Sequence, residues 1–185
     1  ITVLPAEPVN AGADASACLG DPIPLTATGN GVSYSWSPAT GLDNANIATP
    51  VATPATTTQY TVTMTDANNC TASDAVTVTI NPIPVAAFSA TSVCNGFATV
   101  FTNQSTVSSG TIASNNWIFD DSNTSTLASP TNTYLLPGNY SVQLTVVSNQ
   151  GCTNSVTQSI TVHPLPVVGF EAVPTDGCIP LDVPF

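Results

Sequence analysis

The chain has 185 residues, with no lysine or arginine, 11 acidic residues and one histidine, which gives a formal net charge of −11. Binding to nucleic acid or to an anionic membrane surface depends on basic side chains, so this composition excludes both classes of function. Hydrophobic residues make up 42% of the chain, too many for a disordered segment, and no apolar run is long enough for a transmembrane helix.

Sequence landmarks recur along the chain with a period of about 80 residues. Proline-containing junctions of similar sequence stand at Pro5, Pro82 and Pro164. A unit of this length is large enough for a small β-sandwich domain. The register predicts the last strand of a preceding repeat at 1–4, complete repeats at 5–82 and 83–164, and the truncated start of a further repeat at 165–185.

Within each repeat, apolar residues alternate with threonine or serine, which is the period of half-buried β-strands. In chain order the alternation runs through residues 60–64, 76–80, 140–146 and 160–162. No helical period is visible, and the 16 prolines would interrupt most helices. We therefore expect an all-β fold of tandem immunoglobulin-like β-sandwiches. Short proline linkers would join the sandwiches end to end.

Four aromatic residues keep the same spacing and are expected in the structural core. Trp36 and Trp117 lie in the middle of their repeats on short strands, and Tyr60 and Tyr140 each begin a long strand. A buried tryptophan that packs between two sheets is typical of immunoglobulin-like sandwiches. The alternative is a ligand-stacking role for the tryptophans, which would require them to lie exposed in a row.

The five cysteines also follow the repeat. In each complete repeat, one cysteine lies near an early strand and a second lies in the hairpin before the last strand. We therefore expect the disulfides Cys18–Cys70 and Cys94–Cys152, each clamping one end of its own sandwich. Cys178 holds the corresponding place in a further repeat, so we expect its partner outside the segment. Disulfides indicate an oxidising compartment, and no Cys-x-x-Cys motif favours metal binding instead.

The second repeat resembles the PKD domain, a sandwich family common in bacterial surface proteins. The resemblance rests on WIFDDSNTS at 117–125 and PGNYSVQLTV at 137–146. The family pattern has glycine where Asp120 and Ser122 stand here, a departure that bears on the local tight turn rather than on the fold. The first repeat is similar to a related immunoglobulin-like repeat. Such repeats alternate with PKD domains in long adhesins of Bacteroidota-like bacteria, which implies an extracellular or cell-surface location.

Groups that could carry catalysis are sparse. His163 is the only histidine, it lies at a linker beside prolines, and lysine is absent. We expect no catalytic residue and no cofactor-binding residue, because no nucleophile, base and orienting group come together. The best candidate for a cation is calcium at Asp120, Asp121 and Asn123, which supply hard oxygen donors. The alternative is an Asx turn, in which such side chains bond their own backbone.

These observations favour a structural role in a secreted cell-surface repeat protein, as part of an extracellular fibre, filament or adhesin stalk. The alternative is an accessory module that binds polysaccharide or protein in a secreted multidomain enzyme. Expected partners are the neighbouring repeats of the same chain, and homotypic filament assembly or a surface ligand would be compatible with the pattern. Glycan attachment is left open by N-x-[ST] matches at Asn69, Asn103, Asn123 and Asn139.

Overall fold

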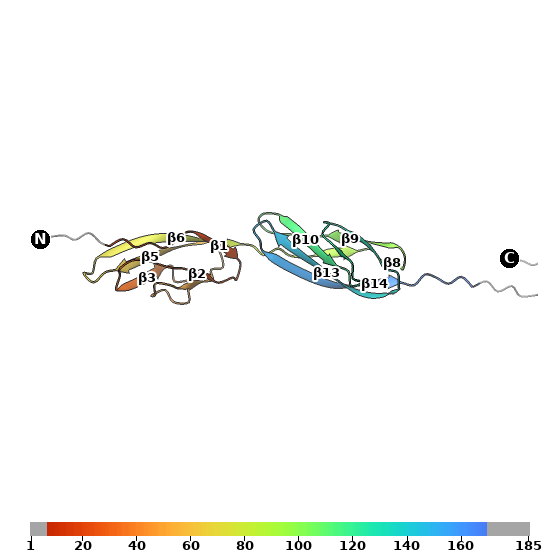
Figure 1. Ribbon diagram of the computed structural model, residues 1–185, viewed down its shortest axis with the longest axis horizontal. Helices are drawn as coiled ribbons and strands as arrows, with labels where there is room; N and C mark the ends of the chain where they lie inside the picture. Colours follow the sequence, from red (N-terminus) through yellow and green to blue (C-terminus); the bar gives the residue numbers. More distant parts are fainter. Residues whose placement is uncertain (1–6, 170–185) are drawn as a thin grey trace, which may run out of the picture.

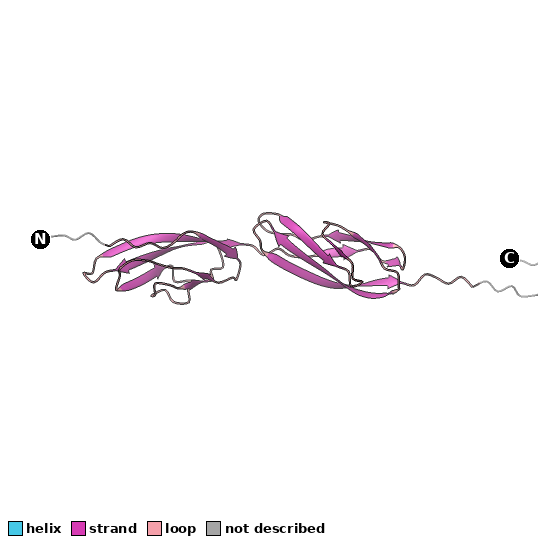
Figure 2. Ribbon diagram, viewed as in Figure 1, coloured by secondary structure: helices cyan, strands magenta, loops and turns pink. Residues whose placement is uncertain are grey.

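The computed structural model describes residues 7–169, which form two groups of β-strands that follow each other along the long axis of the molecule (Figure 1). Every regular element in this range is a β-strand (Figure 2), which confirms the expected all-β class. None of these residues forms a helix that could cross a membrane. The expected strand at 1–4 and the pairing of Cys178 lie outside the described residues. We call the two groups the N-terminal domain, up to Asn81, and the C-terminal domain, from Val85.

The N-terminal domain has a main sheet of four strands in the order β1-β6-β5-β3. Their bounds are Ala15–Cys18 for β1, Ser33–Ser37 for β3, Thr58–Thr65 for β5 and Thr71–Asn81 for β6. The short strands β2 (Ile23–Pro24) and β4 (Val51–Ala52) form a second sheet that packs on the same core. β1 runs parallel to β6, whereas the other neighbours in the main sheet are antiparallel.

The C-terminal domain repeats this plan with two larger sheets. The five-stranded sheet has the order β11-β10-β13-β14-β8 and the three-stranded sheet has the order β12-β9-β7. The bounds are Phe88–Ala90 for β7, Val93–Cys94 for β8, Ala98–Asn103 for β9, Ile112–Ile118 for β10, Thr124–Ser125 for β11, Thr131–Thr133 for β12, Gly138–Ser148 for β13 and Thr153–His163 for β14. β8 runs parallel to the end of β14, as β1 does to the end of β6.

Each domain has a separate hydrophobic core. Trp36 and Tyr60 are buried in the N-terminal core, and Trp117 is buried in the C-terminal core. Tyr140, at the place that corresponds to Tyr60, is only partly buried. The interior position is taken by Tyr134, whose ring centroid lies 4.0 Å from that of Tyr140. Sequence periodicity did not indicate Tyr134, because it follows the short strand β12 rather than lying on a long alternating strand.

The turn after β10 keeps its left-handed backbone although glycine is absent. Asp120 and Ser122 have φ values of 64° and 71°. A side chain in this conformation costs roughly 1–2 kcal/mol. A carboxylate oxygen of Asp120 accepts a hydrogen bond from the Ser141 backbone N–H at 2.9 Å, which offsets part of that cost. Asp120 and Ser122 therefore strain the turn without removing it.

We expect Ser122→Gly to stabilise the C-terminal domain by about 1 kcal/mol, because glycine removes the left-handed strain and the Ser122 side chain is exposed. Asp120→Gly is the matched variant: it relieves similar strain but also loses the bond to Ser141, so its gain is expected to be smaller. Urea unfolding of the two variants and the wild type measures both effects. A lower stability for Ser122→Gly would contradict this account of the turn.

Tyr134 makes the stability of the C-terminal domain dependent on pH in the alkaline range. Burial and, to a smaller extent, the carboxylates of Asp121 and Asp120 raise the pKa of Tyr134 to about 12. The unfolded chain releases this proton near pH 10. Stability is therefore fully present below about pH 10 and falls as the pH rises towards about 12, since the unfolded state then binds fewer protons.

The test is urea unfolding of the C-terminal domain between about pH 9 and about pH 11. Tyr134→Phe is expected to flatten the alkaline decline. It also loses the hydrogen bond that the Tyr134 hydroxyl donates to the Phe119 carbonyl at 3.1 Å, which costs about 1 kcal/mol at neutral pH. An equal alkaline decline in wild type and variant would assign the effect to other groups.

Candidate functional site at the junction of the two domains

A disulfide bond links the two domains. It joins Cys18 at the end of β1 to Cys152 just before β14, with their Cα atoms 5.6 Å apart and 134 positions apart in sequence. Among residues 7–169, Cys70 and Cys94 form no disulfide. The expected pairs Cys18–Cys70 and Cys94–Cys152 were therefore wrong, and so was the expectation that each bond clamps one end of a single sandwich.

Strand direction explains why the pairs within one domain cannot form. Cys18 lies beside Asn81 at the end of β6, because β1 is parallel to β6, whereas Cys70 immediately precedes β6. The 11 residues of β6 span about 35 Å at about 3.3 Å per residue. A disulfide tolerates a Cα separation of only about 7 Å. β8 and β14 separate Cys94 from Cys152 in the same way.

The bond lies directly beside the linker between the domains. The Leu19 backbone N–H donates to the Asn81 carbonyl at 3.0 Å, which holds Cys18 next to the point where the chain leaves the N-terminal domain. On the other side, the side-chain amide of Asn154 donates to the Pro84 carbonyl at 2.8 Å. Two covalent connections, the linker backbone and the disulfide, therefore cross the junction close to each other.

A small open cleft of about 280 Å³ lies at the same junction. Leu19, Thr56 and Ile80 line it from the N-terminal domain, and Ser108 and Ser109 line it from the C-terminal domain. The loop around Ser108 thus faces the end of the preceding sandwich. Apolar side chains and hydroxyl groups from both domains therefore line this cleft beside the disulfide.

The candidate calcium ligands are engaged in hydrogen bonds within the protein. The Asp121 carboxylate accepts bonds from the backbone and side-chain nitrogens of Asn123, both at 3.0 Å, and from the side-chain amide of Asn132 at 2.7 Å. Asp120 instead bonds the Ser141 backbone. Among the described residues, no group of three or more His, Cys, Asp or Glu side chains is placed to hold a metal ion. The contacts correspond to the Asx-turn alternative.

We expect removal of divalent cations with EDTA to leave the melting temperature of the C-terminal domain unchanged. The reason is that the oxygens of Asp121 already accept amide hydrogens, and an amide hydrogen and a cation compete for the same lone pairs. Differential scanning calorimetry with and without EDTA measures the effect. A lower melting temperature that added Ca²⁺ restores would show that the loop holds the ion.

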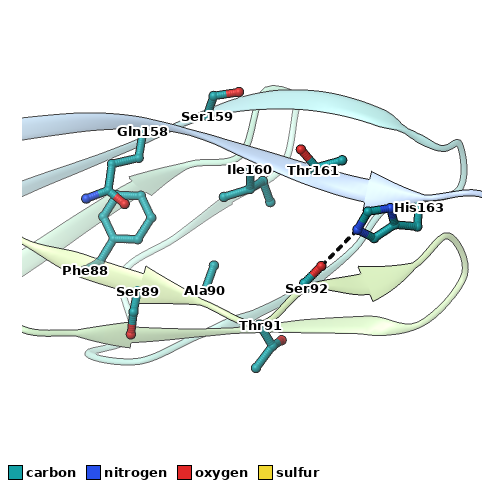
Figure 3. A pocket seen from close by; sticks show the side chains of 10 residues that line it. All are labelled: Phe88, Ser89, Ala90, Thr91, Ser92, Gln158, Ser159, Ile160, Thr161 and His163. Carbon is teal, nitrogen blue, oxygen red and sulfur yellow. Dashed lines mark hydrogen bonds between the residues drawn. The ribbon is translucent and has the colours of Figure 1, made fainter.

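An open groove of about 580 Å³ lies between β7 of one sheet and β14 of the other in the C-terminal domain (Figure 3). Phe88 lies at one end and Ile160 near the middle, and the side chains of Ser89 and Thr161 point away from the facing strand (Figure 3). His163 lies at the other end, with its Nε2 atom 3.1 Å from the Ser92 hydroxyl. Among the described residues no acidic side chain hydrogen-bonds His163, so this pair lacks the orienting group of a catalytic triad.

Comparison with known protein families gives one match for each domain. Residues 79–163 match the PKD domain, and residues 5–82 match an Ig-like domain described as CHU_C associated. The second match covers the part of the chain for which sequence analysis gave only a related immunoglobulin-like repeat. A search among curated proteins gave no match.

Some solved structures match about one domain of the chain, and others match most of its length. The PKD1 domain of the Vibrio cholerae metalloprotease PrtV has 38% sequence identity and a TM-score of 0.40, and the match covers 44% of this chain and 98% of that one. A carbohydrate-binding module from the β-sandwich superfamily has 34% identity and a TM-score of 0.44 over 45% of this chain and 36% of that one. The N-terminal eight Ig domains of the Down syndrome cell adhesion molecule match 84% of this chain and 27% of that one, with 13% identity and a TM-score of 0.61.

Proposed function

Because the chain belongs to the PKD and CHU_C-associated Ig-like families of bacterial surface domains, over residues 79–163 and 5–82, we propose that it is a stiff, non-catalytic spacer of a secreted surface protein. In this role tandem sandwiches form part of a fibre or adhesin stalk that holds other parts of the protein away from the cell. The role requires that neighbouring domains keep a fixed orientation.

The disulfide between Cys18 and Cys152 is the observation that carries this proposal. Two domains joined by a short linker generally move relative to each other unless their interface is large and apolar. Here the second covalent connection at the junction opposes that motion, and the hydrogen bond from Asn154 to the linker carbonyl of Pro84 acts in the same direction. A disulfide also fits an oxidising location outside the cytoplasm.

Small-angle X-ray scattering tests stiffness directly. We expect the wild-type chain to give a single extended shape, and the double variant Cys18→Ser/Cys152→Ser to sample a broad range of angles between the domains. The matched control is Cys70→Ser/Cys94→Ser, which removes two thiols that make no bond in this structure and should scatter like the wild type. Identical profiles for all three proteins would contradict the proposed stiffening.

An accessory binding module is the second candidate function, and the groove between β7 and β14 is the observation that favours it. The side-chain amide of Gln158 and the hydroxyl group of Ser92 point into the groove (Figure 3) and could bond the hydroxyl groups of a polysaccharide. Trp36 and Trp117 are buried, so they do not form the exposed aromatic platform expected for such a module. Calorimetric titration with cellulose and chitin oligosaccharides would separate the two roles, since the spacer role predicts no heat of binding.

A further inference from the structure

We propose that Cys70 and Cys94 are half-cystines of further interdomain disulfides, each completed by the matching cysteine of another domain of this construction. Cys94 would bond a hairpin cysteine of the Cys152 type, and Cys70 would bond a strand-end cysteine of the Cys18 type. The inference extends the proposed spacer role, because it continues the same covalent link beyond both ends of the domain pair.

The local structure of Cys94 matches that of Cys18. Each cysteine ends a short strand that runs parallel to the end of the last strand of its domain. After Cys18, the Leu19 N–H donates to the Asn81 carbonyl at 3.0 Å; after Cys94, the Asn95 N–H donates to the His163 carbonyl at 2.8 Å. The next residues, Gly20 and Gly96, have φ values of 91° and 83°. Both cysteines therefore lie at the same end of their domains, the end at which the last strand finishes. We call each end of a domain a pole.

The local structure of Cys70 matches that of Cys152. The Asp66 N–H donates to the Cys70 carbonyl at 2.9 Å, and the Ser148 N–H donates to the Cys152 carbonyl at 2.8 Å. In each hairpin the first side chain also accepts from the cysteine N–H, through the carboxylate of Asp66 at 2.8 Å and the hydroxyl of Ser148 at 3.2 Å. Both hairpins thus hold the sulfur at the opposite pole from the Cys18-type position.

The surface around Cys94 gives an independent argument for a docked partner. Phe97, Leu135, Leu136 and Leu165 are exposed by 61%, 79%, 70% and 50%. Asn95 ties this patch together, since its side chain donates to the Leu135 carbonyl and accepts from the Leu165 N–H. A clustered apolar surface of this kind marks an interaction site. At the observed junction, the corresponding pole of the N-terminal domain faces the loop of Ser108.

The proposed partner is therefore another sandwich whose hairpin pole carries a cysteine, as the C-terminal domain does at the observed junction. The pole around Cys70 is the complementary surface on the N-terminal domain. Contact between Cys94 of one copy and Cys70 of a second copy would reproduce the observed junction between molecules. A head-to-tail contact of this kind leaves a free pole at each end and can propagate as a linear array.

Two variants, both made in the Cys178→Ser background, test the pairing. With Cys178 replaced, Cys70→Ser keeps only the Cys94 thiol and Cys94→Ser keeps only the Cys70 thiol, so neither can form a head-to-tail chain alone. Both are mixed in a glutathione buffer, where the two thiols give up two protons and two electrons and one glutathione disulfide is reduced to two glutathione thiols. We expect a disulfide-linked heterodimer in the mixture and monomers in each separate sample.

Non-reducing gel electrophoresis and peptide mapping give the readout. Endoproteinase Asp-N replaces trypsin, because the chain contains no lysine or arginine. The crosslinked peptide should contain Cys70 and Cys94, while the peptide with Cys18 and Cys152 stays intact. Leu135→Asp/Leu136→Asp in the Cys70→Ser protein is expected to slow heterodimer formation by about tenfold, since the docked apolar surface is lost.

Equal dimer yields in the separate and mixed samples, or a mixture that remains monomeric, would overturn the proposal. The result is separate from the scattering test of the spacer role, which depends on Cys18 and Cys152 and not on Cys70 or Cys94. A stiff domain pair without a heterodimer would leave the spacer role in place and remove only the extended disulfide series. If the heterodimer forms but the two domains of each chain are flexible relative to each other, the disulfide series stands and the spacer role is removed.

Discussion

In the double variant Cys18→Ser/Cys152→Ser, whichever domain unfolds first is expected to have a lower free energy of unfolding than in the wild type. The expected difference is about 4 kcal/mol. While one domain stays folded, the linker and the disulfide hold both ends of the other domain's chain together. The unfolded chain is then closed into a loop of about 65 residues, and its lost entropy favours the folded state. A change of this size corresponds to a melting temperature lower by about 20 °C for a domain of this length.

Differential scanning calorimetry of the wild type, this variant and Cys70→Ser/Cys94→Ser measures the effect. The control variant loses two thiols that make no bond within the described residues and should melt close to the wild type. Equal shifts in the two double variants would mean that the serine substitutions themselves, rather than the loss of the crosslink, cause the destabilisation.

Trp117→Ala is expected to destabilise the C-terminal domain by about 5 kcal/mol, at the upper end for a large-to-small change in a core. The Trp117 side chain is fully buried. Its ring centroid lies 5.1 Å from that of Phe88 and 5.6 Å from that of Phe101, and its Nε1–H donates to the Leu127 carbonyl at 3.0 Å. The substitution leaves a cavity among aromatic rings and removes the donor for that carbonyl.

The matched change in the other core is Trp36→Ala, whose Nε1–H donates to the Ile47 carbonyl at 2.9 Å. Because the two hydrophobic clusters share no residue, each variant should lower only the transition of its own domain in a calorimetric scan. If either substitution lowered both transitions by similar amounts, the two domains would unfold as one cooperative unit. The two cores would then not stabilise their domains independently.

Periodicity predicted the strands well because a half-buried strand repeats every two residues. The residues Tyr60, Val62 and Met64 alternate with threonine in the sequence and point into the core in the structure. The pattern carries no such signal for Tyr134, which follows the short strand β12 and packs against the ring of Tyr140. Its position became visible only once the two sheets were placed.

The positions of the cysteines were evident from the sequence, but their pairing was not. Pairing within a repeat assumed that Cys18 and Cys70 lie near each other, whereas the parallel alignment of β1 with β6 places them at opposite poles. The parallel contact is made by only four residues of β1, and the alternation of side chains is the same in parallel and antiparallel strands. Which cysteines of two domains pair also depends on which ends of the domains meet. The sequence of a single repeat does not show this.

The disulfide across the junction changes how the chain would carry tension. A pull on its two ends passes from Cys18 straight to Cys152, so the segment between them is not in the load path. Their separation of 134 residues corresponds to about 450 Å of extended chain at about 3.4 Å per residue, and this length cannot be drawn out. A proteolytic cut between residues 19 and 151 would likewise leave both fragments covalently attached.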